Sequence, residues 1–407
     1  MDVKRTVTAG FLPLTDCMIL AIAREKGFAS QNGIDLILSK EQSWASIRDH
    51  MAVGHYDVAH LLAPMPIAFN TKLAPFSVPV FAPMALGLGG NAVTLSNAIW
   101  DLALDKGATE ECDPSVNGKA LKVLIEEELK PKNRTLRVAV VHPFSGHNLE
   151  LRYWFSACGI NPDTDVEILV VPPPLMPDAL ASGRIDGYCV GEPWNSVSVE
   201  SGIGKITTTK AAIWHSSPEK VLGVQVSWAE QNPDLLDALL VSLFEAAKWC
   251  GQRSNQQEIA EILSKPAFIG VPASTILPAL SGNLSTGPGK ILKGDDIIVP
   301  FDRAATFPWQ SHALWFYSQM VRWGQIQHSE KNAEIARNSY RPDLYRRALM
   351  NTNAAVPAAN MKVEGALEVP TAVGSTGRLM LGPDGFFDDR IFDPDKLDEY
   401  IADFDRG

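Results

Sequence analysis

The segment RVAVVHPFSGHNLELRYWF, residues Arg137 to Phe155, contains the change of hydrophobic period that decides the fold class. Its first part, Val138 to Val141, is a short apolar run rich in β-branched residues, which predicts a buried strand. From Leu149 onward the apolar residues suggest a helix, so the polar link at 143–148 lies at a strand-to-helix turn. Turns of this kind are where α/β proteins bind small ligands.

Two interpretations of this turn are open from its residues alone. Backbone N–H groups at the start of a helix favour an anion, Gly146 lets the backbone come close, and His147 adds a side-chain donor. Alternatively, Ser145 or Asn148 simply caps the helix and His147 is a surface residue.

The same alternation of strand and helix occurs elsewhere in the chain. Thr6 to Leu12 predicts a strand, the helix that follows continues to Gly27, and Ile34 to Leu38 predicts a second strand. This is a βαβ unit, which indicates a parallel sheet and an α/β fold.

Composition and charge limit the classes of partner. The chain has 407 residues, is 46% hydrophobic, and carries a formal net charge of -11 with a pI near 5.3. An acidic protein of this kind is not expected to have nucleic acid or a membrane surface as its main partner. Any anion that it binds must therefore be held by a local site.

The N-terminus has no apolar region of secretory length, and no segment approaches the roughly 20 apolar residues of a membrane span. We therefore expect a cytoplasmic protein without membrane insertion. The five cysteines are an odd number without metal-like spacing, which suits reduced thiols.

The usual cofactor and metal motifs are not matched. The glycine-rich runs at 87–90 and 282–289 fit neither nucleotide-binding pattern, and no histidine pair has metalloenzyme spacing. We expect no cofactor and no metal. Cys17, near the first strand-to-helix turn, could be a catalytic thiolate, but a buried structural thiol is the more ordinary interpretation.

Five positions at predicted turns or strand ends could converge on one cleft: Trp44, Asn91, His147, Gly191 and Lys220. Trp44 could supply a flat apolar wall, and the polar side chains could donate hydrogen bonds to oxygens, with Lys220 adding charge. A small oxyanion needs this mixture. The alternative is that Trp44 belongs to the core and Lys220 is solvated.

Several longer runs carry a resemblance to a known family: GFLPLTDCMILAIAREKGF, SWASIRDHMAVG, AHLLAPMP, GGNAVTLSN, HPFSGHNLELRYWF, GYCVGEPWN, SPEKVLGV and FPWQSHALWFYSQMVRWGQI. Over most of its length the chain resembles the nitrate- and bicarbonate-binding proteins of ABC transporters and their cytoplasmic sensor relatives.

The resemblance implies a two-lobed, periplasmic-binding-protein-like (type II) α/β fold with the ligand in the cleft between the lobes. It implies a first lobe from 1–95 and 213–349 and a second lobe from 96–212. The segment 350–407 would form a C-terminal strap and docked arm.

The nitrate pocket of that family looks like Trp44, Asn91, His147, Gly191 and Lys220 here. Asn91 stands where the transporter proteins carry a glutamine, so its shorter reach is a departure from the family pattern. A cation at Lys220 suits nitrate or nitrite, whereas the bicarbonate-type relatives combine an acidic residue with a metal.

With no leader expected, the chain looks most like the cytoplasmic NasS-type sensor. Such a sensor is not an enzyme; it holds an RNA-binding antitermination regulator of the NasT type and releases it when nitrate or nitrite binds. Two alternatives remain open, the solute-binding component of a nitrate/nitrite ABC transporter and a cysteine-dependent enzyme acting at Cys17.

Overall fold

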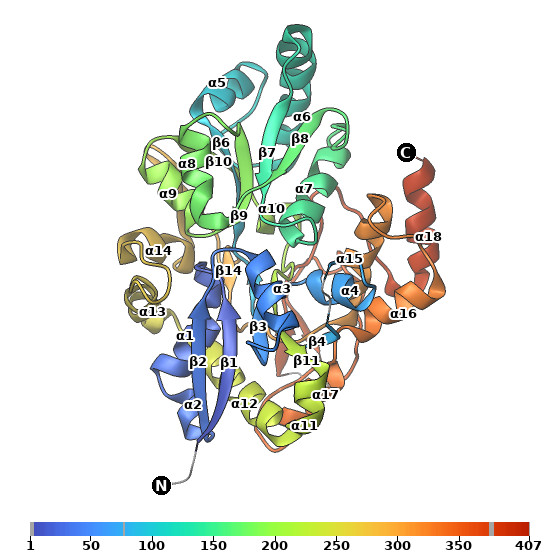
Figure 1. The fold of residues 1–407 in the computed structure, drawn as a ribbon. Coiled ribbons are helices and arrows are strands. Elements are labelled where there is room, and N and C mark those ends of the chain that lie inside the picture. Colours follow the sequence, from blue (N-terminus) through green and yellow to red (C-terminus); the bar gives the residue numbers. More distant parts are fainter. Residues whose placement is uncertain (1–3, 76–77, 374–377, 407) are drawn as a thin grey trace.

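Two lobes, stacked one above the other in Figure 1, make up the protein. The computed structural model describes residues 4–75, 78–373 and 378–406. Each lobe is built on a five-stranded sheet with helices packed around it. The two-lobed α/β architecture expected from the sequence is confirmed.

The sheet of the first lobe has the strand order β2-β1-β3-β11-β4. Its strands are β1 (Arg5–Phe11), β2 (Ile34–Lys40), β3 (Val58–Leu62), β4 (Val80–Ala85) and β11 (Lys220–Gln225). The strand β1 is parallel to β2 and β3, which confirms the predicted βαβ unit. The late strand β11 is antiparallel to both β3 and β4, so the chain returns to this sheet after building the second lobe.

The sheet of the second lobe has the order β10-β6-β9-β7-β8. Its strands are β6 (Asn91–Ser96), β7 (Leu136–Val140), β8 (Val166–Val170), β9 (Gly187–Gly191) and β10 (Gly204–Thr209). The segment that opened the sequence analysis forms β7 and then α7 (Gly146–Ala157), as its change of hydrophobic period predicts. Because β7 is parallel to β8 and β9, its carboxyl end faces the junction where the ends of those strands also lie.

The first crossing between the lobes lies before Asn91 rather than near Leu95, because β6 pairs with β9 and β10 of the second sheet. The expected boundary between residues 95 and 96 therefore falls inside β6. The run at 91–95 is uniformly buried, so its hydrophobic pattern could not show which sheet it joins. The return crossing lies between β10, which ends at Thr209, and β11, which begins at Lys220.

Helices flank both sheets. Those preceding the second lobe are η1 (Thr15–Cys17), α1 (Met18–Glu25), α2 (Phe28–Gln31), α3 (Trp44–Ala52) and α4 (Met65–Asn70). Those between the crossings are α5 (Asn97–Asp105), α6 (Pro114–Leu124), η2 (Ile125–Leu129), η3 (Lys130–Lys132), α7, η4 (Pro173–Leu175), α8 (Met176–Ala181), α9 (Trp194–Glu200) and α10 (Lys210–Ile213). Those that follow β11 are α11 (Val226–Gln231), α12 (Pro233–Cys250), η5 (Arg253–Asn255), α13 (Gln256–Leu263), α14 (Ala273–Leu280), α15 (Gln310–Arg322), α16 (Glu330–Asn338) and α17 (Pro342–Leu349).

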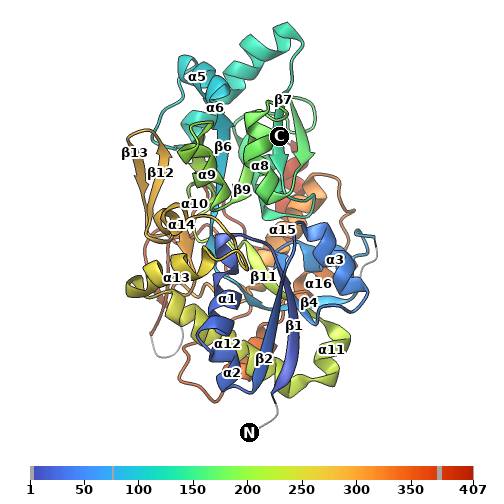
Figure 2. The ribbon, with the colours of Figure 1, turned by 60° about the vertical axis from the view of Figure 1, so that its left-hand side comes forward.

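Small strand pairs connect segments outside the two main sheets. They are β5 (Leu88–Gly89) with β14 (Ile298–Val299), β12 (Asn283–Gly287) with β13 (Lys290–Lys293), and β15 (Thr371–Val373) with β16 (Leu379–Leu381). The hairpin β12–β13 lies beside β10 and α9, so a segment that follows β11 in the chain packs on the second lobe (Figure 2).

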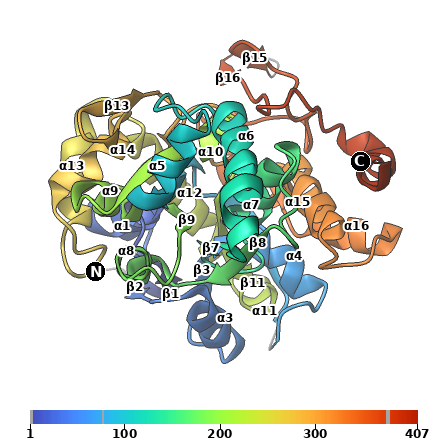
Figure 3. The ribbon, with the colours of Figure 1, turned by 90° about the horizontal axis from the view of Figure 1, so that it is seen from above.

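The C-terminal segment 350–407, expected to be a strap and docked arm, has few regular elements, and its residues 374–377 and 407 lie outside the described residues. It ends in η6 (Pro394–Lys396), α18 (Leu397–Ala402) and η7 (Asp403–Arg406), and α18 packs against α15 (Figure 3). Phe386 stacks on Trp214 with ring centroids 4.7 Å apart. The arm therefore contacts the segment through which the chain returns from the second lobe to the first.

Candidate functional site between the two lobes

The five predicted site residues lie at element ends that face the junction of the lobes. Trp44 begins α3 and Lys220 begins β11 in the first lobe. Asn91 begins β6, Gly191 ends β9 and His147 is the second residue of α7 in the second lobe. All five residues are buried.

Three of these residues are direct neighbours across the junction. The Trp44 and His147 rings have centroids 6.2 Å apart, and Lys220 Nζ lies 5.3 Å from the centroid of the Trp44 ring. Trp44 is buried like a core residue, and one face of its ring lies beside the lysine. Its indole Nε1 donates a hydrogen bond to the carbonyl oxygen of His60, which fixes the ring. Lys220 is fully buried, which excludes the solvated interpretation.

The other two residues form a pair on adjacent strands, where Asn91 lies opposite Gly191. A Cβ added at Gly191 would lie 3.2 Å from Leu14 Cδ2 and 3.3 Å from Asn91 Oδ1. This pair therefore packs against the 13–16 turn of the first lobe. Asp16 in the same turn accepts a hydrogen bond from Lys220, which connects the pair with the other three residues.

Lys220 is held by two carboxylates that the sequence analysis did not assign to the site. Its Nζ donates to Asp16 Oδ2 at 2.7 Å and to Glu219 Oε1 at 3.0 Å. Asp16 Oδ1 in turn lies 3.2 Å from His60 Nε2. Burial alone would raise the pKa of Asp16, but the charges of Lys220 and His60 outweigh burial and lower it to about 2. Asp16 is therefore ionised at neutral pH.

Glu219 connects the two lobes through three charged or polar neighbours. Besides Lys220, its Oε1 lies 3.1 Å from His147 Nδ1, and its Oε2 accepts a hydrogen bond of 2.6 Å from Lys210 Nζ. Lys210 also donates to Glu150 Oε1 at 2.5 Å. We refer to Asp16, His60, His147, Glu150, Lys210, Glu219 and Lys220 as the buried charged cluster.

Gly146 has a different role from the one that the sequence suggested. A Cβ at this position would lie 2.5 Å from Glu219 Oε2 and 3.1 Å from Lys210 Nζ. The glycine thus gives room to a carboxylate of the protein itself at the start of α7. Ser145 caps the same helix by accepting from the backbone N–H of Asn148 at 3.0 Å, so the helix cap of the ordinary interpretation is present. The other half of that interpretation is wrong, because His147 is fully buried rather than a surface residue.

Burial and the neighbouring charges together set the protonation states of the side chains in the buried charged cluster. Burial raises the pKa of Glu150 to about 8 and lowers the pKa of His147 to about 3. Burial opposes ionisation of Glu219 too, but His147, Lys210 and Lys220 hold its pKa well below the usual range. Around neutral pH, Glu219 is therefore a carboxylate and His147 a neutral imidazole.

Several buried polar atoms at the junction have no hydrogen-bond partner within the part of the chain that the structure describes. They include Thr15 Oγ1, both amide atoms of Asn91, both ring nitrogens of His147 and Ser217 Oγ. Buried polar groups are normally paired, and each unpaired one costs about 1–3 kcal/mol. Unpaired donors gathered between two lobes are what an enclosed site for a small polar ligand requires.

One alternative from the sequence, a catalytic Cys17, loses support. Cys17 is 1% exposed, and burial raises the pKa of its thiol well above the usual value, so it is not a thiolate at neutral pH. Among the described residues there is no group of three or more histidine, cysteine, aspartate or glutamate side chains that could hold a metal ion. No helix in the described ranges has the length and apolar character that crossing a membrane requires.

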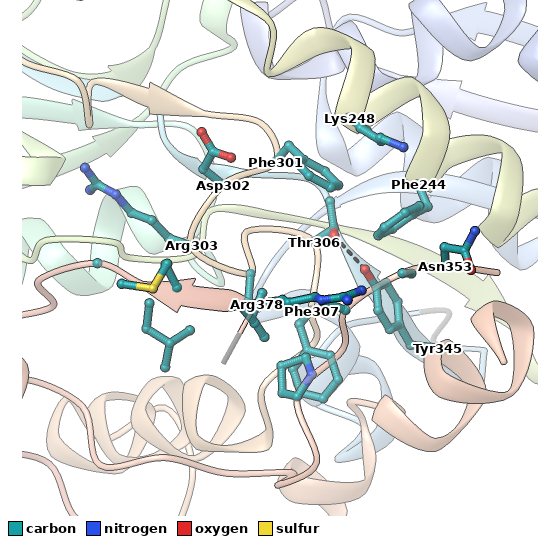
Figure 4. A pocket seen from close by; sticks show the side chains of 18 of the residues that line it. Phe244, Lys248, Phe301, Asp302, Arg303, Thr306, Phe307, Tyr345, Asn353 and Arg378 are labelled. Atoms are coloured by element: carbon teal, nitrogen blue, oxygen red, sulfur yellow. Dashed lines mark hydrogen bonds between the residues drawn. The ribbon is translucent and has the colours of Figure 1, made fainter. Parts of the chain in front are cut away.

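An open cavity of about 600 Å³ lies elsewhere, between α12, the 301–307 segment, α17 and the C-terminal strap. Figure 4 shows its aromatic wall, in which Thr306 and Tyr345 share a hydrogen bond of 2.7 Å. None of the predicted site residues lines this cavity. We place the functional site at the lobe junction because the unpaired polar atoms and buried charges gather there.

Comparison with known proteins shows the family of this chain. Residues 2–264 match the model of the NMT1-like family. The chain belongs to the NMT1-like family. It is 31% identical over 403 residues to the nitrate/nitrite binding protein NrtA of Nostoc sp. (strain PCC 7120), covering 96% of this chain and 84% of that protein.

Other relatives include a bicarbonate-binding protein. CmpA of Synechococcus elongatus is 30% identical over 415 residues, covering 98% of this chain and 86% of CmpA. The crystal structure of the periplasmic nitrate-binding protein NrtA from Synechocystis PCC 6803 superposes with a TM-score of 0.85 at 29% identity, covering 98% of each chain. This NMT1-like chain thus has the fold of a periplasmic binding protein, and the relatives named here are binding proteins rather than enzymes.

Sequence reasoning missed Asp16, Glu150, Lys210 and Glu219. A weak signal existed for two of them, because Asp16 lies in the first strand-to-helix turn and Glu219 precedes Lys220 directly. Glu150 and Lys210 are 60 residues apart in the chain, and they come together only when the second lobe folds.

Proposed function

We propose that this chain is a nitrate- or nitrite-binding protein and acts as the solute-binding component of an ABC transporter. The observation that carries the proposal is the fully buried Lys220 ammonium, which lies between the lobes beside Trp44 and His147. One relative that binds nitrate and one that binds bicarbonate each match nearly the whole chain. The charges at this site help to decide which of the two anions this chain binds.

The charge of the site suits a small monovalent anion. Two protons of the Lys220 ammonium are donated to Asp16 and Glu219, which leaves the third for a ligand. The two carboxylates limit the net positive charge near the lysine, so a divalent oxyanion would meet more repulsion than a monovalent one.

The remaining predicted residues fit a flat oxyanion. Trp44 offers an apolar wall, and the unpaired amide of Asn91 can donate to an oxygen. Gly191 leaves space that any side chain would reduce. A bicarbonate site of the kind expected from the family resemblance would need a metal, and the described residues offer no cluster for one.

A transporter component is better supported than the sensor that the sequence suggested. The nitrate-binding relative of known structure is periplasmic, and the nitrate import ATP-binding protein NrtC of Synechocystis sp. is 33% identical over 348 residues, covering 84% of this chain and 49% of NrtC. The cytoplasmic location and the RNA-binding antitermination regulator as partner stay predictions. Size-exclusion chromatography with such a regulator, with and without nitrate, tests the sensor. A nitrate-sensitive complex would favour it over the transporter component.

The test of the anion site is a calorimetric titration of the purified protein with nitrate, nitrite, bicarbonate and sulfate. We expect binding of nitrate or nitrite at a stoichiometry of one and no binding of sulfate. Lys220→Gln should lose nitrate binding by at least about 100-fold, since a buried charge-assisted contact is removed.

The glutamine variant is preferable to Lys220→Glu, which would place a third carboxylate beside Asp16 and Glu219 and destabilise the fold. Lys205→Gln, on β10 and only partly buried, serves as the matched control. Undiminished nitrate affinity in a folded Lys220→Gln protein would remove this lysine from the site and overturn the proposal.

A further inference from the structure

Glu219 contacts both side chains that would donate to the anion. One oxygen, Oε1, lies 3.0 Å from Lys220 Nζ and 3.1 Å from His147 Nδ1. The other oxygen accepts from Lys210 and lies where Gly146 leaves room for it. The carboxylate is therefore fixed from both lobes, and it fixes the histidine ring and the lysine relative to each other.

The position of Glu219 favours one of the two nitrogens of His147 as the site of the proton on the neutral ring. Nδ1 lies 3.1 Å from the Glu219 carboxylate, although the two groups are not aligned for a hydrogen bond. An ionised carboxylate at that distance favours the N–H form of Nδ1, because the other tautomer would place two lone pairs against each other. A neutral ring with its proton on Nδ1 has a lone pair on Nε2. That lone pair would repel an anion rather than bind it.

The Nε2 atom is nevertheless buried without a hydrogen-bond partner among the described residues. His147 is 0% exposed, and the charged groups that act on it are Glu219, Lys220, Lys210 and Asp16. Burial, Lys220 and Lys210 oppose a positive charge on the ring, whereas Glu219 and Asp16 favour one. An anion beside Nε2 would add a further negative charge and change this balance.

We propose that an anion enters this site together with a proton, which binds Nε2 of His147, and that Glu219 is the positioning residue that makes this coupling necessary. The inference rests on the proposed function, because it requires an anion at the junction. The proton comes from solvent and forms one N–H bond with the Nε2 lone pair, so the step needs no other reactant.

The pH range of the effect follows from the charges. Without ligand, the pKa of His147 is about 3. An anion beside Nε2 would raise that pKa, because the opposite charges attract each other. Nitrate should therefore bind about tenfold more tightly at pH 5 than at pH 7.5, because at the lower pH a proton is bound in the anion-loaded state and not in the free protein.

Proton uptake measured at pH 5 separates His147 from the other buried groups. Burial raises the pKa of Glu150 to about 8 and that of Glu192 to about 7, so both are already protonated at pH 5. Asp16, with a pKa of about 2, stays ionised there. His142 has a pKa lowered by burial to about 4 and is the histidine most in need of a control.

The experiment is a calorimetric titration with nitrate at pH 5 and pH 7.5, in two buffers of different ionisation enthalpy that contain no small oxyanion. Nitrate does not titrate in this range, so any proton taken up is bound by the protein. We expect uptake of about one proton per nitrate at pH 5 in the wild type. His147→Gln should abolish this uptake, and His142→Gln should retain it.

Glu219→Gln tests the positioning role, because a neutral amide can donate to Nδ1 and so leave Nε2–H as the donor of a neutral ring. This variant should bind nitrate with little dependence on pH. Since it leaves Lys210 and Lys220 short of one carboxylate and could fail to fold, the wild type labelled with 15N-histidine supplies a second readout. Nitrate at pH 5 should shift the Nε2 signal of His147 to the protonated form.

The possible failures are distinguishable. Nitrate binding without proton uptake at pH 5, or uptake that persists in His147→Gln, overturns this inference and leaves the proposed function standing. Failure of nitrate and nitrite to bind at either pH overturns the proposed function itself.

Discussion

The indole Nε1 of Trp194, in the second lobe, donates a hydrogen bond of 3.0 Å to the carbonyl oxygen of Pro13 in the first lobe. Beside it, the backbone N–H of Thr15 donates to the carbonyl oxygen of Glu192 at 2.8 Å. Gly191 and Asp16 are the neighbours of these residues in the chain. The contacts that join the lobes are therefore continuous with the proposed anion site, and the structure has the closed arrangement.

Trp194→Phe should weaken nitrate binding about two- to tenfold, because it removes one hydrogen bond worth about 0.5–1.5 kcal/mol that forms only when the lobes close. Titration calorimetry measures the loss. Trp228→Phe, which changes a partly buried indole on α11 of the first lobe, is the control and should bind normally. Equal affinities of Trp194→Phe and the wild type would show that this contact does not contribute to closure.

Gly191→Ala should reduce nitrate affinity while the protein remains folded. The new methyl group would lie 3.2 Å from Leu14 Cδ2 and 3.3 Å from Asn91 Oδ1, so both neighbours must move by a few tenths of an ångström. We expect a loss of about tenfold, as for a small overpacking strain of about 1–2 kcal/mol. Gly385→Ala is the matched control and should bind nitrate normally, since nothing lies within 4 Å of the Cβ that it adds. Calorimetric titration of both variants with nitrate measures the change in affinity, and thermal unfolding checks that both remain folded.

Glu364→Gln should lower the free energy of unfolding at pH 7 by about 3 kcal/mol, because it leaves a buried ammonium short of one carboxylate. Glu364 pairs with Lys362, which also donates to Asp384 at 2.6 Å, and it accepts from Ser311 at 2.6 Å. These bonds fasten the C-terminal strap to α15. Urea unfolding measures the change, and Glu334→Gln on the exposed face of α16 should have little effect.

The same carboxylate predicts a pH dependence of stability. Burial would raise the pKa of Glu364, but Lys362 and His312 outweigh burial and lower it to about 2, from an ordinary 4.5. Because the folded-state pKa is the lower one, this contribution is complete above about pH 4.5 and is lost as the pH falls toward 2. Glu364→Gln should therefore flatten the acid limb of the stability curve. An unchanged acid limb would exclude Glu364 as its source.

Cys17→Ala should leave nitrate affinity unchanged and lower the free energy of unfolding by about 1 kcal/mol. The thiol is buried in the core beside the site, and its raised pKa keeps it unreactive. Slow alkylation of the native protein, compared with the unfolded protein, is the corresponding chemical test. Rapid loss of nitrate binding on alkylation of native protein would contradict this assignment.

Much of the fold could be predicted from the sequence alone. The change from a β-branched apolar run to helical spacing within 137–155 predicts β7 and α7, and the early βαβ pattern predicts a parallel sheet. These signals are local, because they depend on which face of each element is buried. The positions of Trp44, Asn91, His147, Gly191 and Lys220 at element ends followed from the same patterns together with the family resemblance.

What only the tertiary structure decided was the pairing of distant charges. The sequence contains Asp16, Glu150, Lys210 and Glu219, but no local pattern shows that they are buried or which lysine each one faces. Buried carboxylates and ammonium groups are stable only as partners, and the partners here come together only through the folding of both lobes. That is why a strand, a helix cap and a histidine could be predicted, whereas the contact of His147 with Glu219, 72 residues away, could not.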